Sequence, residues 1–282
     1  MYKKAQDIGE IRSITMITKF NLDEFLLKYP YTLQLINENN IEIDTLSAIY
    51  KDYVTHMDAY QNHGDFIANI LRSQKNIHTV KSRMKEPDRL IEKVIRKTAD
   101  RKNKYGEDFQ LTAENYKDEI NDLIGIRVIH IFKEQWQEIH EYIVNTWNVI
   151  EITANVREGD NVEVFKNLDI EVRSRASGYR SVHYLVEFYP TNRRVIAEIQ
   201  VRTIFEEGYG EIDHRLRYSH IEIPEILKSN LLLFNRIIGS ADEMASLINT
   251  LNHEWCEKES SYQRIIEEQR REIERLQLNN HK

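Results

Sequence analysis

Two acidic residues stand at positions where a carboxylate could do chemistry. Asp122 immediately precedes the apolar run 123–132. A carboxylate at the mouth of a buried strand can hold Mg²⁺, which needs only one or two protein carboxylates besides water and phosphate oxygens. An aspartate that caps the entry to the strand would look the same. Glu198 begins an alternating run in which Glu198, Gln200 and Arg202 share one face of a strand, as a solvated row would also do.

Basic residues are concentrated ahead of Asp122. Residues 81–104 contain ten Lys or Arg against four Asp or Glu, in a chain whose net charge is −7. A helix is predicted over 87–97, because Pro87 suits a first helical position and apolar residues recur on one side. Its other side carries Arg89, Lys93, Arg96 and Lys97. Such cations can hold a polyphosphate, with guanidinium groups also stacking on a base, or they can simply face water.

A glycine–tyrosine pair lies in the arginine-containing stretch 173–183. Gly178 permits a tight backbone before the next strand, so that Tyr179 is presented as a flat surface on which a purine can stack. An exposed loop tyrosine would show the same pattern.

The spacing of apolar residues divides the chain into helical ends and a β-rich centre. Helical spacing runs through 1–75 and returns after Pro224. Strands are predicted at 123–132, 149–156, 182–189 and 194–201, with a helix around Trp136, Ile139 and Ile143. These elements predict an α+β fold with a mixed sheet flanked by helices. We expect an N-terminal helical region at 1–75, a core domain at 76–220, and C-terminal helices with a charged tail at 221–282.

A heptad-like pattern marks the C-terminal region. Apolar residues alternate by four and three at Leu227, Leu231, Phe234, Ile238, Ala241, Ala245 and Ile248. This spacing predicts helix pairing, within the chain or between chains. The last 25 residues or so, rich in Glu, Arg and Gln, predict a solvated helix.

Composition limits the classes of function. The net charge of −7 argues against a protein that coats nucleic acid with its whole surface. The single cysteine, Cys256, excludes an intramolecular disulfide and favours the reduced cytosol. No stretch approaches the roughly 18 apolar residues that a membrane span needs. We therefore expect a cytoplasmic protein with no membrane partner.

Four segments together resemble the synthetase domain of the RelA/SpoT family, and especially its small single-domain alarmone synthetases. They begin at Arg83, Asp122, Arg173 and Glu198, in the family's order and at similar intervals, and the likeness covers roughly residues 78–250. The resemblance implies a nucleotidyltransferase-like mixed β-sheet flanked by helices, with helical extensions at both ends.

The resemblance also implies roles for individual residues. Arg83 and Arg127 would enclose the adenine of ATP, while Lys85, Lys93 and Arg96 would hold its phosphates. Asp122 would bind Mg²⁺, and Glu198 would bind the metal, activate the attacking hydroxyl, or do both. The acceptor nucleotide would be held by Arg175, Tyr179, Ser181, His183 and Gln200.

The implied activity is that of a GTP pyrophosphokinase, which moves pyrophosphate from ATP to the 3′-hydroxyl of GDP or GTP. The chain lacks a His-Asp dipeptide, which argues against the hydrolase domain of long family members. Two alternatives remain: transfer to the 3′ end of tRNA, and a catalytically silent nucleotide-binding regulatory module. The presence of both Asp122 and Glu198 argues against the silent module. The terminal helices could also form a homo-oligomer.

Overall fold

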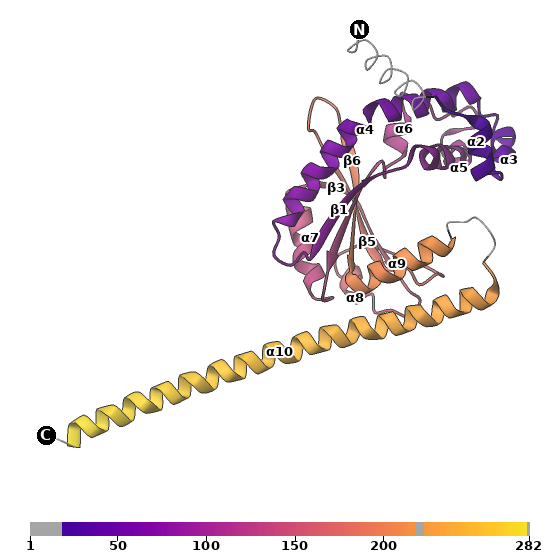
Figure 1. The fold of residues 1–282 in the computed structure, drawn as a ribbon. Coiled ribbons are helices and arrows are strands. Elements are labelled where there is room, and N and C mark those ends of the chain that lie inside the picture. The colour runs from indigo at the N-terminus through magenta and orange to yellow at the C-terminus, as the bar shows by residue number, and fades with distance from the viewer. Residues whose placement is uncertain (1–18, 218–222, 281–282) are drawn as a thin grey trace, which may run out of the picture.

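A six-stranded mixed sheet forms the centre of the computed structural model, which describes residues 19–217 and 223–280 (Figure 1). The strands are β1 (Thr79–Met84), β2 (Ile124–His130), β3 (Asn148–Val156), β4 (Glu171–Ser174), β5 (Ser181–Phe188) and β6 (Val195–Thr203). Their order across the sheet is β1-β2-β6-β5-β3-β4. The pairs β2–β6 and β3–β4 are parallel and the others antiparallel. The predicted mixed sheet and α+β fold are confirmed.

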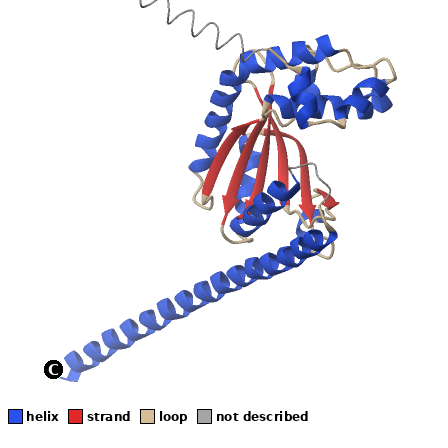
Figure 2. Ribbon diagram, turned by 45° about the vertical axis from the view of Figure 1, so that its right-hand side comes forward, coloured by secondary structure: helices blue, strands red, loops and turns tan. Residues whose placement is uncertain are grey.

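Helices pack against the sheet, and further helices precede its first strand and follow its last strand. They are α2 (Leu22–Lys28), α3 (Thr32–Glu38), α4 (Ile43–Arg72), α5 (Pro87–Tyr105), α6 (Tyr116–Glu119), α7 (Gln135–Thr146), α8 (Glu163–Lys166), α9 (Ile204–Arg217) and α10 (Glu225–Asn280). Helices α4 and α7 lie along one face of the sheet, and α9 crosses the other (Figures 1 and 2). The predicted N-terminal helical region starts within residues 1–18, which lie outside the described part of the chain.

The two strands at the edges of the sheet, β1 and β4, were not predicted from the sequence. Strand β1 carries Lys81 and Arg83 on its exposed side, so it lacks the apolar alternation of a central strand. Charged residues are typical of edge strands, where they discourage pairing with another chain. Arg83 therefore lies on a strand, and Lys85 lies in the turn between that strand and the basic helix α5.

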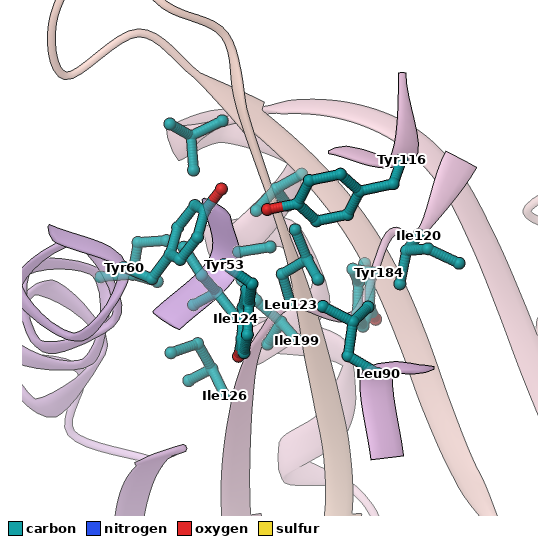
Figure 3. Close-up of a cluster of buried hydrophobic side chains, with 14 of the residues drawn as sticks. Tyr53, Tyr60, Leu90, Tyr116, Ile120, Leu123, Ile124, Ile126, Tyr184 and Ile199 are labelled. Atoms are coloured by element: carbon teal, nitrogen blue, oxygen red, sulfur yellow. The ribbon is translucent and has the colours of Figure 1, made fainter. Parts of the chain in front are cut away.

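A cluster of buried side chains joins α4 to the sheet and fixes the turn that carries Lys85 (Figure 3). Tyr53 on α4 is fully buried in this cluster, and its hydroxyl donates to the Lys85 carbonyl at 2.6 Å. The Tyr116 hydroxyl donates to Asp52 at 2.8 Å on the same helix. Each buried hydroxyl is thus hydrogen-bonded, as burial of a polar group requires.

The C-terminal region is one continuous helix, α10, where several helices were predicted. It packs along α9 and then runs away from the core (Figure 1). Its core-facing side includes Leu231, Asn235 and Asp242, which are 5%, 1% and 1% exposed. Farther along, Trp255 and Tyr262 are exposed. The predicted solvated tail is therefore a helix with exposed side chains.

The predicted heptad coincides only in part with the buried side of α10. Leu231 is buried, but Leu227 and Ile248 are 43% and 58% exposed. Pairing within the chain is observed, between α10 and α9. Pairing between chains stays a prediction. Across 19–217 and 223–280, no helix combines the length and the apolar character needed to cross a membrane.

Candidate active site

The pairing of β2, β6 and β5 places residues from distant parts of the sequence side by side on one face of the sheet. Arg127 on β2 lies opposite Gln200 on β6, and Gln200 lies opposite His183 on β5. Two residues earlier on each strand, Gly125 lies opposite Glu198. Because alternate residues of a strand share a face, these side chains project on the same side of the sheet.

Asp122, just before β2, lies between two lysines. Lys85 Nζ is 2.6 Å from Asp122 Oδ2, and Lys93 Nζ on α5 is 2.8 Å from Oδ1. Burial alone would raise the pKa of Asp122, but the two ammonium groups outweigh it and lower that pKa to about 2. The carboxylate is therefore ionised and already neutralised by neighbouring cations.

Glu198 is held by the imidazole of His183. His183 Nδ1 lies 3.1 Å from Glu198 Oε1, and Gln200 Nε2 donates to Oε2 at 2.6 Å. Burial raises the pKa of Glu198, but the hydrogen bond and charge of His183 lower it below its usual range. On its other side, His183 Nε2 lies 3.0 Å from the Tyr179 hydroxyl. Tyr179, His183 and Glu198 thus form a hydrogen-bonded chain.

The ring of Tyr179 is positioned by a left-handed glycine and by Arg202. Gly178 has φ +77°, a conformation that side chains other than glycine rarely adopt. The guanidinium carbon of Arg202 lies 5.3 Å from the centre of the Tyr179 ring, a cation–π contact. The His183 ring meets the same tyrosine edge-on, at 5.9 Å between ring centres.

Glu207 on α9 bridges Arg127 on β2 and Arg202 on β6. It lies 3.1 Å from Arg127 NH1 and 3.2 Å from Arg202 NH1, and Arg127 also donates to Glu211. Arg202 in turn donates to Gln200 at 2.5 Å. The sequence predicted the face on which Arg202 lies. It gave no signal that Arg202 would be buried beneath Tyr179, or that Glu207 would bridge two arginines.

Two recesses open onto this face. The larger, about 480 Å³, is lined by Arg83, Met84, Lys85, Glu86, Arg89, Glu211, His214 and Arg215. The smaller, about 70 Å³, is lined by Glu151, Thr153, Asn155, Arg173, Arg175, His183, Leu185 and Glu198. The predicted ATP-binding residues Arg83 and Lys85 thus line one recess, and the predicted acceptor residues Arg175 and His183 line the other.

Two predicted site residues, Arg96 and Ser181, line neither of these two recesses. Arg96 is exposed on α5, with its Nε 3.3 Å from Glu92 on the same helix. Ser181 is 4% exposed, and its hydroxyl donates to the Val201 carbonyl at 3.2 Å. The structure brings neither side chain into the Asp122 cluster or the smaller recess, so their binding roles remain predictions.

Comparison with known proteins identifies the family. Residues 82–222, half of the chain, match the family model described as "Region found in RelA / SpoT proteins". The chain belongs to the RelA/SpoT family. It is 26% identical over 180 residues to the GTP pyrophosphokinase YwaC of Bacillus subtilis (strain 168), covering 62% of this chain and 75% of YwaC. It is 27% identical over 135 residues to the GTP pyrophosphokinase YjbM of the same organism, covering 46% of this chain and 57% of YjbM.

The fold agrees with this membership. The crystal structure of the small alarmone synthetase 1 from Bacillus subtilis superposes with a TM-score of 0.55 at 21% identity, covering 72% of this chain and 98% of that structure. At this identity the likeness establishes the fold of a RelA/SpoT synthetase domain. The activity has to be inferred from the residues of the site.

Two carboxylates of this RelA/SpoT domain, Asp122 and Glu198, are of the kind that Mg²⁺ uses together with water and phosphate oxygens. In the described ranges, no group of three or more His, Cys, Asp or Glu side chains is arranged to hold a metal ion. Asp122 and Glu198 are both ionised and precede or lie on the neighbouring strands β2 and β6. One or two carboxylates, completed by water and phosphate oxygens, are what Mg²⁺ uses in nucleotide sites.

Proposed function

We propose that this protein transfers pyrophosphate from ATP to the 3′-hydroxyl of GDP or GTP. The main support is the arrangement of two carboxylates, Asp122 just before β2 and Glu198 on the adjoining strand β6. Asp122 lies between Lys85 and Lys93, and Glu198 is hydrogen-bonded to His183. The lysines offer charge for phosphates, and His183 connects Glu198 to Tyr179, the predicted stacking surface for guanine.

Phosphoryl-type transfer needs alignment and charge neutralisation more than covalent help from the protein. Lys85 and Lys93 would bind the triphosphate and leave Asp122 free to hold Mg²⁺, which would supply positive charge to the phosphate oxygens. Tyr179 would place the acceptor ribose beside Glu198. The acceptor oxygen would then bond to the β-phosphorus, the bond to the α,β-bridging oxygen would break, AMP would leave, and Glu198 would accept the hydroxyl proton.

One of the two arginines beside the acceptor recess, Arg173, favours a nucleotide acceptor over tRNA. Arg173 is paired with Glu171 at 2.7 Å and with Glu151 at 3.3 Å, so its charge is largely used within the sheet. An extended polyanion would need uncompensated cations beyond the nucleotide pocket.

A labelling experiment tests this proposal. The protein is incubated with Mg²⁺, ATP labelled in its β-phosphate, and GDP, GTP or tRNA in separate reactions. We expect label on GDP or GTP, and transfer to tRNA at least about tenfold slower and weakly dependent on salt. Preferential labelling of tRNA, with a rate that falls steeply as salt rises, would support the tRNA alternative. No transfer to any acceptor would support the silent module.

We further propose that α10 pairs with a second copy of the chain. Beyond the core, exposed apolar side chains recur at Leu251, Trp255, Tyr262, Ile266 and Ile273. Their separations alternate between four and seven residues, an 11-residue repeat of about 3.67 residues per turn that is typical of a right-handed coiled-coil seam. Light scattering after size-exclusion chromatography would report the assembly, and replacement of Ile266 and Ile273 by Glu should reduce it.

A further inference from the structure

The turn that carries Tyr179 is held from behind by both C-terminal helices. The Tyr209 hydroxyl on α9 donates to the Ser177 carbonyl, and Asn235 Nδ2 on α10 donates to the Gly178 carbonyl at 2.8 Å. Asn235 is 1% exposed. A buried amide is costly unless its polar atoms are hydrogen-bonded, so this contact specifies how α10 docks against the turn.

The second polar atom of Asn235 holds the residue on the other side of Tyr179. Asn235 Oδ1 accepts from Arg180 NH1 at 3.1 Å. Arg180 also donates to both oxygens of Asp160, at 2.6 and 3.0 Å, in the loop between β3 and α8. Asn235 therefore contacts both chain neighbours of Tyr179, and one of these, Arg180, is itself anchored to a second loop.

The fit between α10 and the turn is close. A Cβ added to Gly178 would lie 2.7 Å from Asn235 Cγ, which is closer than Cβ atoms come to other non-bonded heavy atoms in proteins. One turn farther along α10, a Cβ added to Gly239 would lie 3.3 Å from Arg180 NH2. The turn thus has little freedom to shift toward the helix.

We propose that Asn235 is a positioning residue of the acceptor site, acting through Gly178 and Arg180 to fix the ring of Tyr179. This inference rests on the proposed function. It concerns a residue beyond the family match, which ends at residue 222. Asn235 bonds to Gly178 and Arg180 on the acceptor side of the site, so we expect the effect to fall on the acceptor.

Kinetics of Asn235→Ala test this inference. Because stacking of a base on an aromatic ring contributes to its binding, the KM for GDP should rise about tenfold, while the KM for ATP stays within about twofold. Asn235→Asp keeps the acceptor for Arg180 but loses the donor to Gly178, so it should also raise the acceptor KM. The matched control is Asn230→Ala on the same helix, since Asn230 is exposed and its side-chain amide donates to the Ile226 carbonyl of its own helix.

A double-mutant cycle with Tyr179→Ala distinguishes positioning from general loss of structure. If Asn235 acts through Tyr179, the Asn235→Ala change should have little further effect on acceptor KM once the ring is gone. Additive effects, or equal rises in the KM values for ATP and GDP, would overturn the inference.

Two further measurements keep the result interpretable. Should Asn235→Ala fail to fold by circular dichroism, Gly239→Ala presses on Arg180 without deleting a hydrogen bond and should raise the acceptor KM in the same direction. Titration calorimetry of the wild-type chain with GDP distinguishes failure of the proposed function from failure of this inference. A wild-type chain that neither binds nor labels GDP overturns the proposed function and this inference together, whereas normal wild-type behaviour with an unchanged variant KM overturns the inference alone.

Discussion

Lys85 Nζ lies 2.6 Å from Asp122 Oδ2, so an ammonium group contacts the carboxylate that is expected to bind a metal. Lys93 occupies the other oxygen. A metal ion must therefore compete with the two lysines for Asp122. Binding of a triphosphate to the lysines would remove this competition. We expect Mn²⁺, used as a probe for Mg²⁺, to bind weakly alone and much more tightly with a non-hydrolysable ATP analogue.

Calorimetry with Lys85→Met checks this competition. Removing the ammonium should raise the affinity for Mn²⁺ without nucleotide, and should weaken binding of the ATP analogue. Lys81→Met, an exposed lysine on β1, is the control. Tight Mn²⁺ binding to the wild-type chain without nucleotide would contradict the competition.

Asp122→Asn and Glu198→Gln should each abolish transfer and leave the fold intact. Both changes keep the shape of the side chain and remove the charge, and loss of an electrostatic group of this kind costs on the order of 100-fold or more in rate. Asp118→Asn is a suitable control, because Asp118 is 66% exposed and its pairing with Arg194, at 3.6 Å, is loose. Turnover within about threefold of wild type in either site variant would show that the carboxylate is misassigned.

Tyr179→Ala should chiefly weaken use of the acceptor. Loss of a stacking surface worth roughly 1–3 kcal/mol predicts an acceptor KM between several-fold and about a hundredfold higher. Tyr179→Phe keeps the ring and removes only the hydroxyl that contacts His183, so its acceptor KM should stay near the wild-type value. Steady-state kinetics with GDP varied at saturating ATP gives both numbers, and an unchanged KM in the alanine variant would argue against stacking.

Asp242 should make the docking of α10 sensitive to pH. Burial and the charge of Glu206 raise the pKa of Asp242 to about 7, although Lys133, 3.9 Å away, and the hydrogen bond with Thr203 act in the opposite direction. Between the unfolded value of 3.8 and about 7, the folded chain binds this proton and the unfolded chain does not. Stability from this group therefore falls as pH rises through that window.

Asp242→Asn removes the ionisation and keeps the shape. The variant should gain stability over wild type between pH 5 and pH 7, by at most about 3 kcal/mol for two pKa units. Urea unfolding at the two pH values measures the difference. A constant gap between variant and wild type would mean that Asp242 titrates near its ordinary pKa.

Truncation should separate the two parts of α10. A chain ending at residue 256 keeps Leu231, Asn235 and Asp242, the buried contacts with the core, and should retain activity. A chain ending at residue 222 loses them all and should be insoluble or inactive. Full activity of the shorter chain would refute the structural role of α10.

The central strands could be predicted from the sequence because they are apolar and alternating. Strands β1 and β4 could not, since one is charged and the other is only Glu171–Ser174. The resemblance led to Asp122, Glu198, Tyr179 and His183, which the structure places on one side of the sheet. It could not lead to the docking of α10, because apolar periodicity carries no signal for a helix that packs through a buried Asn235 and Asp242.

The parallel pairing of β2 with β6 also determines when the site can form. Ile124 pairs with Ala197, whereas β5 and β6 are successive antiparallel strands. Pairing across a long intervening segment carries a large loop-closure cost, and such contacts tend to form late in folding. Asp122 and Glu198 come together only through this pairing, so a nascent chain cannot complete the site before the ribosome has released β6.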